Sequence, residues 1–243
     1  MVLKIIINNI NLFKKSIDAI NVLNNDVNFI ATKEGISLIS TDPSQISLIN
    51  YIAPKEQFEE YIYNEDVELM FGLHIDSLLQ ILQHSNNNEK LILEIIENKI
   101  KIQLIGDSKR YFELPLIDIY KENLSLPEIK WTNIININSK DIIDTINDSK
   151  LFSNFINFKL LDNKLLISSN SSKGNFCQEI ILNENQEISI EKSYFNIDFL
   201  KLMLKNSENI INISLAKDLP MKIKYNLDKI KIEYILAPRV DID

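Results

Sequence analysis

The chain has 243 residues, of which 45% are hydrophobic and 25% are charged, and this composition indicates a soluble globular protein of one or two domains. Its formal net charge of −8 argues against binding to nucleic acid by bulk electrostatic attraction, although charge can be distributed unevenly over the surface. The single cysteine, Cys177, excludes an internal disulfide, and two histidines, His74 and His84, leave no plausible zinc site, so we expect a reducing intracellular compartment, no metal and no cofactor.

Short strand-like segments dominate the first half of the chain. A strand at residues 3–7 leads into an amphipathic helix at residues 10–23, and a second helix is expected at residues 75–82. The steps Lys33-Glu34-Gly35 and Glu97-Asn98 have the character of hairpin turns, because Gly and Asn tolerate positive φ. Further strands in this half are expected at residues 29–32, 36–41, 46–52, 67–71, 91–95, 99–105 and 111–116.

The second half repeats the plan of the first. A strand at residues 134–137 leads into a helix at residues 139–150, and the helix at residues 197–204 repeats the one at residues 75–82 after an offset of 122 residues, about half the chain. Such a repeat indicates a duplicated domain. Further strands are expected at residues 155–160, 165–169, 176–182, 210–215, 221–225 and 230–236, with a turn at Asp162-Asn163.

All four predicted helices are amphipathic, which means that each has one apolar stripe and one polar stripe. We expect each helix to lie on a sheet through its apolar stripe and to leave its polar stripe to water or a partner. The apolar stripes consist of Ile10, Phe13, Ile17 and Ile20; Ile75, Leu78, Leu79 and Leu82; Ile142, Ile143 and Ile146; and Ile197, Leu200, Met203 and Leu204.

An extended connector separates the two halves. It has neither a helical nor an alternating period, and Pro115 and Pro127 lie at its start and within it. We therefore predict an N-terminal domain at residues 1–115, an interdomain connecting loop at 116–132 and a C-terminal domain at 133–243.

The sequence offers no pattern for catalysis or for membrane insertion. The four glycines are isolated, which excludes a Walker or dinucleotide loop, and Cys177 lies in a predicted strand away in sequence from either histidine, so we interpret it as structural rather than nucleophilic. Glu59-Glu60 is interpreted as a solvated edge rather than a catalytic pair. No apolar run approaches the roughly 18 residues of a membrane span, and residues 2–7 lack the flanks of a signal peptide. We expect a protein that is not an enzyme, not secreted and not membrane-bound.

Short motifs along the chain resemble the archaeal and eukaryotic sliding clamp, proliferating cell nuclear antigen. They are residues 114–118 (LPLID) with 126–128 (LPE), residues 41–44 (TDPS), Lys14-Lys15, residues 219–221 (LPM), and the ending at 236–241 (LAPRVD). The resemblance covers the whole chain, and Pro43 and the Arg239-Val240 ending are closer to the archaeal branch. The bacterial clamp uses three domains in a longer chain, which the length of this chain excludes.

The resemblance implies an α+β fold of two similar domains, each with antiparallel β-sheets and two helices on one face, and three subunits that close a trimeric ring with twelve helices lining the hole. The segments 109–116 and 174–182 are edge-strand candidates, and open apolar edges invite pairing between subunits. The alternative is that each edge is covered within its own subunit. The predicted subunit interface comprises Lys109, Arg110, Tyr111, Phe112, Phe176, Cys177, Ile180 and Ile181.

The resemblance also implies a groove beneath the connector where partners dock a short peptide with apolar and aromatic anchors. The matching positions are Thr41, Ile46, Leu48, Leu124, Leu126, Ile129, Trp131, Pro220, Leu236, Ala237 and Pro238. An exposed apolar groove with a polar rim is a plausible partner site. Trp131, the single tryptophan, has an alternative role, which is to pin the connector to the second domain.

The helices that line the hole usually present basic residues to DNA in this family. The predicted DNA-facing positions are Lys14, Lys15, Gln80, Gln83, Lys140, Lys201 and Lys205. Gln80 and Gln83 stand where lysines are common, and the third helix carries Asp144, Asn147 and Asp148 with only Lys140 and Lys150 beside them. A ring holds DNA by topology and needs few phosphate contacts, so we expect function with weak DNA affinity.

The expected function is that of a DNA polymerase sliding clamp, which encircles duplex DNA and tethers replication and repair enzymes. The implied partners are double-stranded DNA, further clamp subunits, the replicative DNA polymerase, the clamp loader, flap endonuclease and DNA ligase. The expected location is the cytoplasm, at the nucleoid, in an archaeal cell and the nucleus in a eukaryotic one. The alternatives are one subunit of a heterotrimeric or checkpoint-type clamp, and a peptide-binding scaffold without a direct DNA role.

Overall fold

The structure is a computed structural model that describes residues 3–120, 124–161, 163–182 and 190–239. The predicted turn residue Asp162 and the ending at Val240 and Asp241 lie outside the described residues. The chain forms two compact units, one of Met1–Leu126 with Asn226–Ile232 and the other of Pro127–Tyr225 with Glu233–Asp243. None of the described helices is both long enough and apolar enough to span a membrane.

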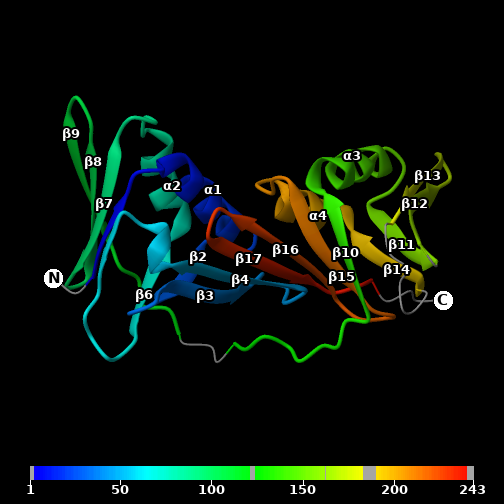
Figure 1. Cartoon of the computed structure of the whole chain (residues 1–243), viewed down its shortest axis with the longest axis horizontal. Helices are drawn as coiled ribbons and strands as arrows, with labels where there is room; N and C mark the ends of the chain where they lie inside the picture. The colour runs from blue at the N-terminus through cyan, green and yellow to red at the C-terminus, as the bar shows by residue number, and fades with distance from the viewer. Residues whose placement is uncertain (1–2, 121–123, 162, 183–189, 240–243) are drawn as a thin grey trace. The chain divides into compact units, whose positions relative to one another are not determined.

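The first unit contains two helices and two groups of antiparallel strands (Figure 1). One sheet has the order β5-β1-β7-β8-β9, and a second group has the order β4-β3-β2-β6. The elements are β1 (Leu3–Ile7), α1 (Ile10–Asn21), β2 (Asp26–Thr32), β3 (Gly35–Thr41), β4 (Ser47–Pro54), the 3-10 turn η1 (Lys55–Gln57), β5 (Glu60–Ile62), β6 (Leu69–His74), α2 (Ile75–Gln83), β7 (Lys90–Ile96), β8 (Lys99–Ile105) and β9 (Lys109–Pro115).

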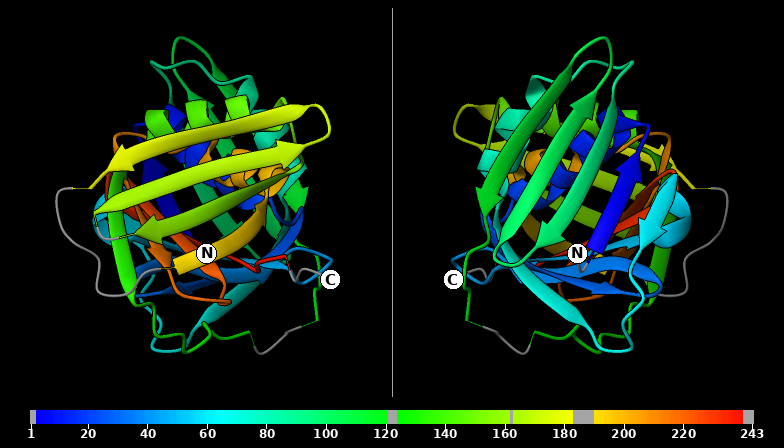
Figure 2. Two further views of the ribbon diagram at one scale, coloured as in Figure 1. Left: turned by 90° about the vertical axis from the view of Figure 1, so that its right-hand side faces the viewer. Right: turned by 90° about the vertical axis from the view of Figure 1, so that its left-hand side faces the viewer.

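The second unit repeats this plan. One sheet has the order β13-β12-β11-β14, and a second group has the order β10-β15-β16-β17. Figure 2 shows the sheet that contains β13 face on in its left view and the sheet that contains β9 face on in its right view. The elements are β10 (Asn133–Asn138), α3 (Ser139–Lys150), β11 (Phe155–Leu161), β12 (Lys164–Ser171), β13 (Gly174–Ile181), β14 (Ile190–Asn196), α4 (Ile197–Leu204), β15 (Ile210–Leu215), β16 (Met221–Leu227) and β17 (Ile230–Leu236), whose first three residues group with the first unit.

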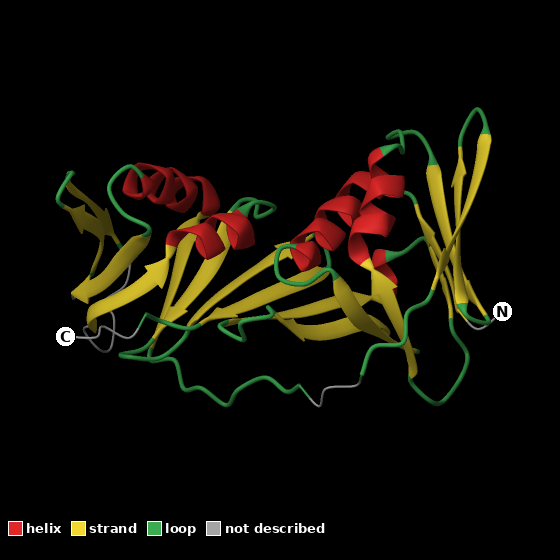
Figure 3. Cartoon of the chain, turned by 180° about the vertical axis from the view of Figure 1, so that it is seen from behind, coloured by secondary structure: helices red, strands yellow, loops and turns green. Residues whose placement is uncertain are grey.

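The helices lie in pairs, α1 beside α2 and α3 beside α4 (Figure 3). In α1, Ile17 and Ile20 are almost completely buried, and in α4 Leu200 and Met203 are buried to the same degree. Burying a side chain of this size contributes about 1.5–3 kcal/mol, so the apolar stripes hold each pair onto its sheets. The prediction of four amphipathic helices is confirmed, with α1 ending at Asn21 rather than near residue 23.

Two strands were not predicted from the sequence. β5 has only three residues, which is too short for a periodic signal. β14 begins in a segment without strict alternation and is held by pairing with β11, for example Tyr194 opposite Asn157. This pairing joins residues far apart in the sequence, so a local pattern could not reveal it.

The same short turn fastens the second helix in both units. In the first unit the Asp76 backbone N–H donates to the Asn25 side-chain oxygen (2.8 Å), and the Asn25 amide donates to the Asp76 carboxylate (2.9 Å). In the second unit the Asn154 side chain accepts from Lys150 Nζ (2.9 Å), which also donates to both oxygens of Asp198 (2.6 and 2.7 Å). In both units the turn also accepts the first helical N–H through a backbone carbonyl, Ile75 N–H to Asn25 (2.7 Å) and Ile197 N–H to Asn154 (2.9 Å), so each turn satisfies a donor at the start of its helix.

Replacing Asn25 with alanine removes both side-chain bonds to α2. We expect Asn25→Ala to lower the free energy of unfolding by about 1–2 kcal/mol, the usual cost of a lost helix cap. Urea denaturation followed by circular dichroism measures the change. Asn8→Ala, at an exposed asparagine just before α1, is the matched control, and an equal loss in both variants would contradict the capping role.

Candidate functional site

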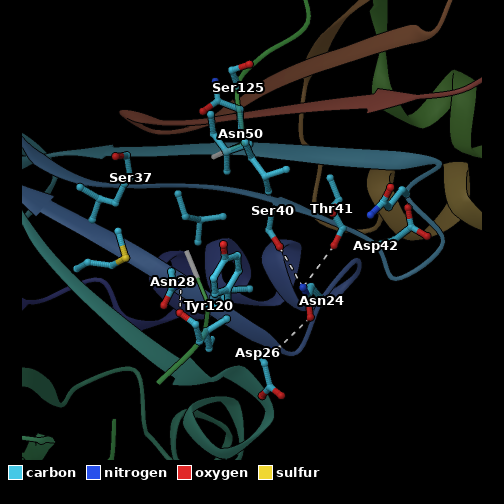
Figure 4. A pocket seen from close by; sticks show the side chains of 18 of the residues that line it. Asn24, Asp26, Asn28, Ser37, Ser40, Thr41, Asp42, Asn50, Tyr120 and Ser125 are labelled. Atoms are coloured by element: carbon cyan, nitrogen blue, oxygen red, sulfur yellow. Dashed lines mark hydrogen bonds between the residues drawn. The ribbon is translucent and has the colours of Figure 1, made fainter. Parts of the chain in front are cut away.

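A cavity of about 700 Å³ opens on the first unit, between its sheet and the first part of the connector. Its wall includes apolar side chains from β2, β3, β4 and β6, among them Ile30, Ile39 and Met70, and the connector contributes Ile119, Tyr120, Leu124 and Ser125. The polar groups in Figure 4 come from the same strands, from the turn before β2, from the loop after β3 and from the connector. Asn24, Asp26, Asn28, Ser37, Ser40, Asp42 and Asn50 supply amide, hydroxyl and carboxylate groups.

The start of the connector is fastened to β6 and β2. The Ile117 backbone N–H donates to the Gly72 carbonyl (3.0 Å), and the Asn28 amide donates to the Ile119 carbonyl (3.2 Å). A Cβ on Gly72 would lie 2.2 Å from the Ile117 carbonyl oxygen, so only glycine permits this close approach. The connector therefore leaves the first sheet in a fixed direction and covers part of the cavity.

The predicted partner-groove residues of the first unit are accessible to different degrees. Ile46 and Leu126 are 39% and 38% exposed, whereas Thr41, Leu48 and Leu124 are half-buried. Thr41 and Leu124 also line the cavity. The first unit thus offers two exposed aliphatic side chains next to half-buried neighbours.

The remaining predicted groove residues belong to the second unit. The Trp131 indole donates to the Pro220 carbonyl (2.9 Å), and Lys222 Nζ lies 4.0 Å from the centre of its ring, so Trp131 pins the end of the connector within this unit. Ile129, Pro220, Ala237 and Pro238 are half-buried, whereas Leu236 is 1% exposed and belongs to the core.

The polar stripes of the helices carry the predicted DNA-facing residues. In the first unit Lys15, Gln80 and Gln83 are exposed, and Lys14 is half-buried. In the second unit Lys140, Lys201 and Lys205 are exposed. Lys150, which flanks the third helix, is instead bound by Asp198 and Asn154. Asp198 largely neutralises the charge of Lys150. The sequence spacing of α3 and α4 does not reveal this pairing between the two helices.

β9 is the last strand of the five-stranded sheet in the first unit, and β13 is the last strand of the four-stranded sheet in the second unit. Tyr111 and Ile181 are each 65% exposed on these strands, and Cys177 is exposed as well. Lys109 is also exposed, whereas Arg110, Phe112, Phe176 and Ile180 are half-buried. In the described part of the chain both predicted interface segments are therefore end strands, which leaves one backbone edge of each without a neighbouring strand in its sheet.

A partly buried ion pair supports the β9 edge. Arg110 donates to both oxygens of Glu89 (2.8 and 2.7 Å), and the Asn86 backbone N–H donates to the same carboxylate (2.7 Å). The hydrogen bond from Asn86, with help from Arg110, holds the pKa of Glu89 below its usual range, although burial acts in the opposite direction. Ionised Glu89 thus ties β9 to the loop before β7.

Because the pKa of Glu89 is lower in the folded state, this carboxylate stabilises the fold above its unfolded pKa of about 4.3, and that contribution is lost as the pH falls through its folded pKa. We expect Glu89→Gln to cost about 1–3 kcal/mol at pH 7. The difference from the wild type should shrink below about pH 4. Thermal denaturation at a series of pH values measures the loss of stability and its decrease in acid, with exposed Glu68→Gln as the control. A stability difference between Glu89→Gln and the wild type that stays constant across pH would contradict this role.

No group of three or more His, Cys, Asp or Glu side chains that could hold a metal ion occurs in the described ranges. The cavity, the helix faces and the two end strands are therefore the features of these units that call for a functional explanation.

The chain is similar to known sliding clamps over almost its whole length. Residues 2–121 match the family described as "Proliferating cell nuclear antigen, N-terminal domain". The DNA polymerase sliding clamp of Methanococcus vannielii is 31% identical, over 94% of this chain and 96% of that protein. DNA polymerase sliding clamp 1 of Pyrobaculum aerophilum is 30% identical, over 94% and 95% of the two chains.

Solved structures show the same fold. PCNA from Thermococcus kodakaraensis superposes with a TM-score of 0.90 at 21% identity, over 98% of this chain and 100% of that one. A. fulgidus PCNA, solved with the C-terminal region of FEN-1 bound, superposes with a TM-score of 0.88 at 21% identity and full coverage of both chains. The predicted α+β clamp fold of two similar domains is thereby confirmed. Together with the 31% identity to an archaeal clamp over nearly its full length, this places the chain in the proliferating cell nuclear antigen family of sliding clamps.

Proposed function

We propose that this protein is a DNA polymerase sliding clamp, a ring that encircles duplex DNA and tethers replication and repair enzymes without catalysing a reaction itself. The observation that carries the proposal is that each unit has a sheet whose last strand, β9 or β13, has no neighbour on one edge within the described residues and carries exposed apolar side chains. Such edges favour pairing with another chain. A β9 edge that meets the β13 edge of the next subunit gives a head-to-tail contact, which closes into a ring when the rotation allows it.

The helix faces support enclosure of a polyanion. Each helix covers its sheet with an apolar stripe and exposes a polar one, and Lys15, Lys201 and Lys205 lie on these polar stripes. The cations are few, and Lys150 is paired with Asp198. We infer that the ring holds DNA by topology with transient phosphate contacts, which is compatible with sliding.

The partners that we propose are double-stranded DNA, two further subunits, the replicative polymerase, the clamp loader, flap endonuclease and DNA ligase. The A. fulgidus relative was solved with a C-terminal region of FEN-1, and the exposed aliphatic residues Ile46 and Leu126 suit the apolar anchor of such a peptide. The archaeal relatives favour a cytoplasmic location at the nucleoid over a nuclear one.

A second candidate is one subunit of a heterotrimeric clamp. The polar stripe of α3 favours it, because Asp144, Asn147 and Asp148 are exposed there. The two carboxylates would repel phosphate, and the asparagine carries no charge to attract it. Other subunits of such a ring would supply more positive charge. Light scattering of this chain purified alone separates the two candidates, since only a homomeric clamp forms a trimer without other subunits.

Placing a charge on the β13 edge should open the ring. We expect Phe176→Asp and Ile180→Asp to convert a trimer into monomers, because each places an unpaired carboxylate in a contact that excludes water. Size-exclusion chromatography with light scattering measures the mass. Leu151→Asp, at a 70% exposed leucine after α3, is the control and should remain trimeric. Trimers in both edge variants would show that the interface lies elsewhere.

Removing the helix lysines should weaken the phosphate contacts alone. We expect the quadruple alanine variant of Lys14, Lys15, Lys201 and Lys205 to stay trimeric and to support less processive synthesis. The deficit should be largest at low salt and shrink as the salt concentration rises, because salt also screens the lysine–phosphate contacts of the wild type. The matched control has the same change in charge and consists of alanine at the exposed residues Lys173, Lys217, Lys224 and Lys231. Equal processivity of the two quadruple variants across a salt titration would contradict the assignment.

A further inference from the structure

The loop between β3 and β4 is organised around one buried carboxylate. Asp42 is 4% exposed and Ser47 is 3% exposed, although both lie at the ends of a surface hairpin loop. One Asp42 oxygen accepts from the Ser47 backbone N–H (2.6 Å) and from the Ser47 hydroxyl (2.8 Å). The other accepts from the Ser44 N–H (2.9 Å). Asp42 thus binds both sides of the loop.

The backbone of the loop is closed by the same residue. The Asp42 N–H donates to the Ser47 carbonyl (3.1 Å), and the Gln45 N–H donates to the Asp42 carbonyl (2.9 Å). Gln45 has φ +56°, a left-handed conformation that costs energy for a residue with a side chain. The surrounding hydrogen bonds therefore hold the loop in one conformation that it would not strongly prefer alone.

A hairpin of this length does not need a buried charge in order to close. Asn-Gly or Asp-Gly turns and short loops with glycine form hairpins with exposed residues. In the described part of the chain no lysine or arginine pairs with Asp42, so its charge is balanced only by hydrogen-bond donors. Burial of such a charge is costly unless the hydrogen bonds to it are strong and well oriented. This cost points to a role beyond closing the turn.

What the arrangement fixes is the backbone on both sides of Ile46, because the N–H groups of Gln45 and Ser47 both donate to Asp42. Ile46 lies at the end of the loop and is 39% exposed, and its neighbours Thr41 and Leu48 are paired strand residues on either side. Figure 4 shows Asp42 beside Thr41 at one end of the cavity. An apolar side chain that is already held in its binding position loses less conformational entropy when a partner docks.

We propose that Asp42 is a positioning residue for partner binding, which acts by holding the loop so that Ile46 is presented as a fixed anchor contact. This inference rests on the proposed peptide docking and adds to it a residue outside the predicted groove. Asp42 itself need not touch the partner. The energetic link between Asp42 and Ile46 is therefore what distinguishes positioning from a general effect on stability.

A double-mutant cycle tests this link. The probe is a synthetic peptide with an aliphatic anchor followed by two aromatic residues, and calorimetry measures its Kd for the wild type, Asp42→Asn, Ile46→Ala and the double variant. We expect each single variant to weaken binding about tenfold, and the double variant to lose much less than the product of the two, because an unfixed loop no longer presents Ile46. Asp42→Asn keeps the side-chain shape but places a donor against an N–H.

Two further variants separate positioning from folding. Ser47→Ala removes one hydroxyl donor and should weaken binding about threefold, while Ser47→Thr, which keeps the hydroxyl, should bind as the wild type does. Asp228→Asn is the matched control, because Asp228 also lies in a hairpin turn with positive φ (53°) and accepts a hydrogen bond from Gln57 (3.3 Å). Its affinity should be unchanged.

The outcomes are distinct for the two proposals. If the peptide does not bind the wild type, the peptide-docking part of the proposed function is wrong, and the positioning role is wrong with it. If the peptide binds and Asp42→Asn binds equally well, or if the losses from Asp42 and Ile46 multiply independently, only the positioning role is overturned. Should Asp42→Asn fail to fold, unchanged binding by Ser47→Ala would overturn it as well.

Discussion

The division of each helix into an apolar and a polar stripe is the constraint on which the rest of this protein depends. Ile17 and Ile20 of α1, like Leu200 of α4, are almost completely buried, so every helix is committed to a sheet on one side. The opposite side must then face water or a ligand. Because the plan occurs twice in one chain, the protein offers two such polar faces and, within the described ranges, two sheets whose end strands have a free edge. The proposed ring follows from having both features in every subunit.

The two units fasten the start of their second helix with different polar groups. In the first, amide groups of Asn21 and Asn25 bind Asp76 at the start of α2. In the second, Lys150 binds Asp198 at the start of α4. The second solution uses a cation that would otherwise be available on the polar stripe. The duplication has therefore kept the packing of the helices, while the polar groups that fasten the second helix differ between the halves.

Local pattern predicted the helices and all strands except β5 and β14, and helix residues such as Phe13 and Ile17, which repeat with the helical period, are buried as expected. β14 was missed because its partner strand β11 is distant in sequence. The partner-groove residues and the DNA-facing residues of the helices were predicted from the resemblance to the family. The burial of Leu236 and the pairing of Lys150 with Asp198 depend on contacts between segments distant in the sequence. The hydrogen bonds of Asp42 are local, to Ser44 and Ser47, but the residue types alone do not reveal that its carboxylate is buried. A buried aspartate before Pro-Ser looks like an ordinary turn residue in the sequence.

Retention on closed and open DNA tests the central claim most directly. The protein, labelled and loaded by a clamp loader onto a nicked circular duplex, is separated from free protein by gel filtration, and the same DNA is then cut once with a restriction enzyme. A clamp that holds DNA by enclosure stays on the circle and leaves the linear product through its ends, with little dependence on salt for the circle. Equal retention on circular and linear DNA, or equal loss from both as salt rises, would show that surface contacts hold the protein and that the ring account is wrong.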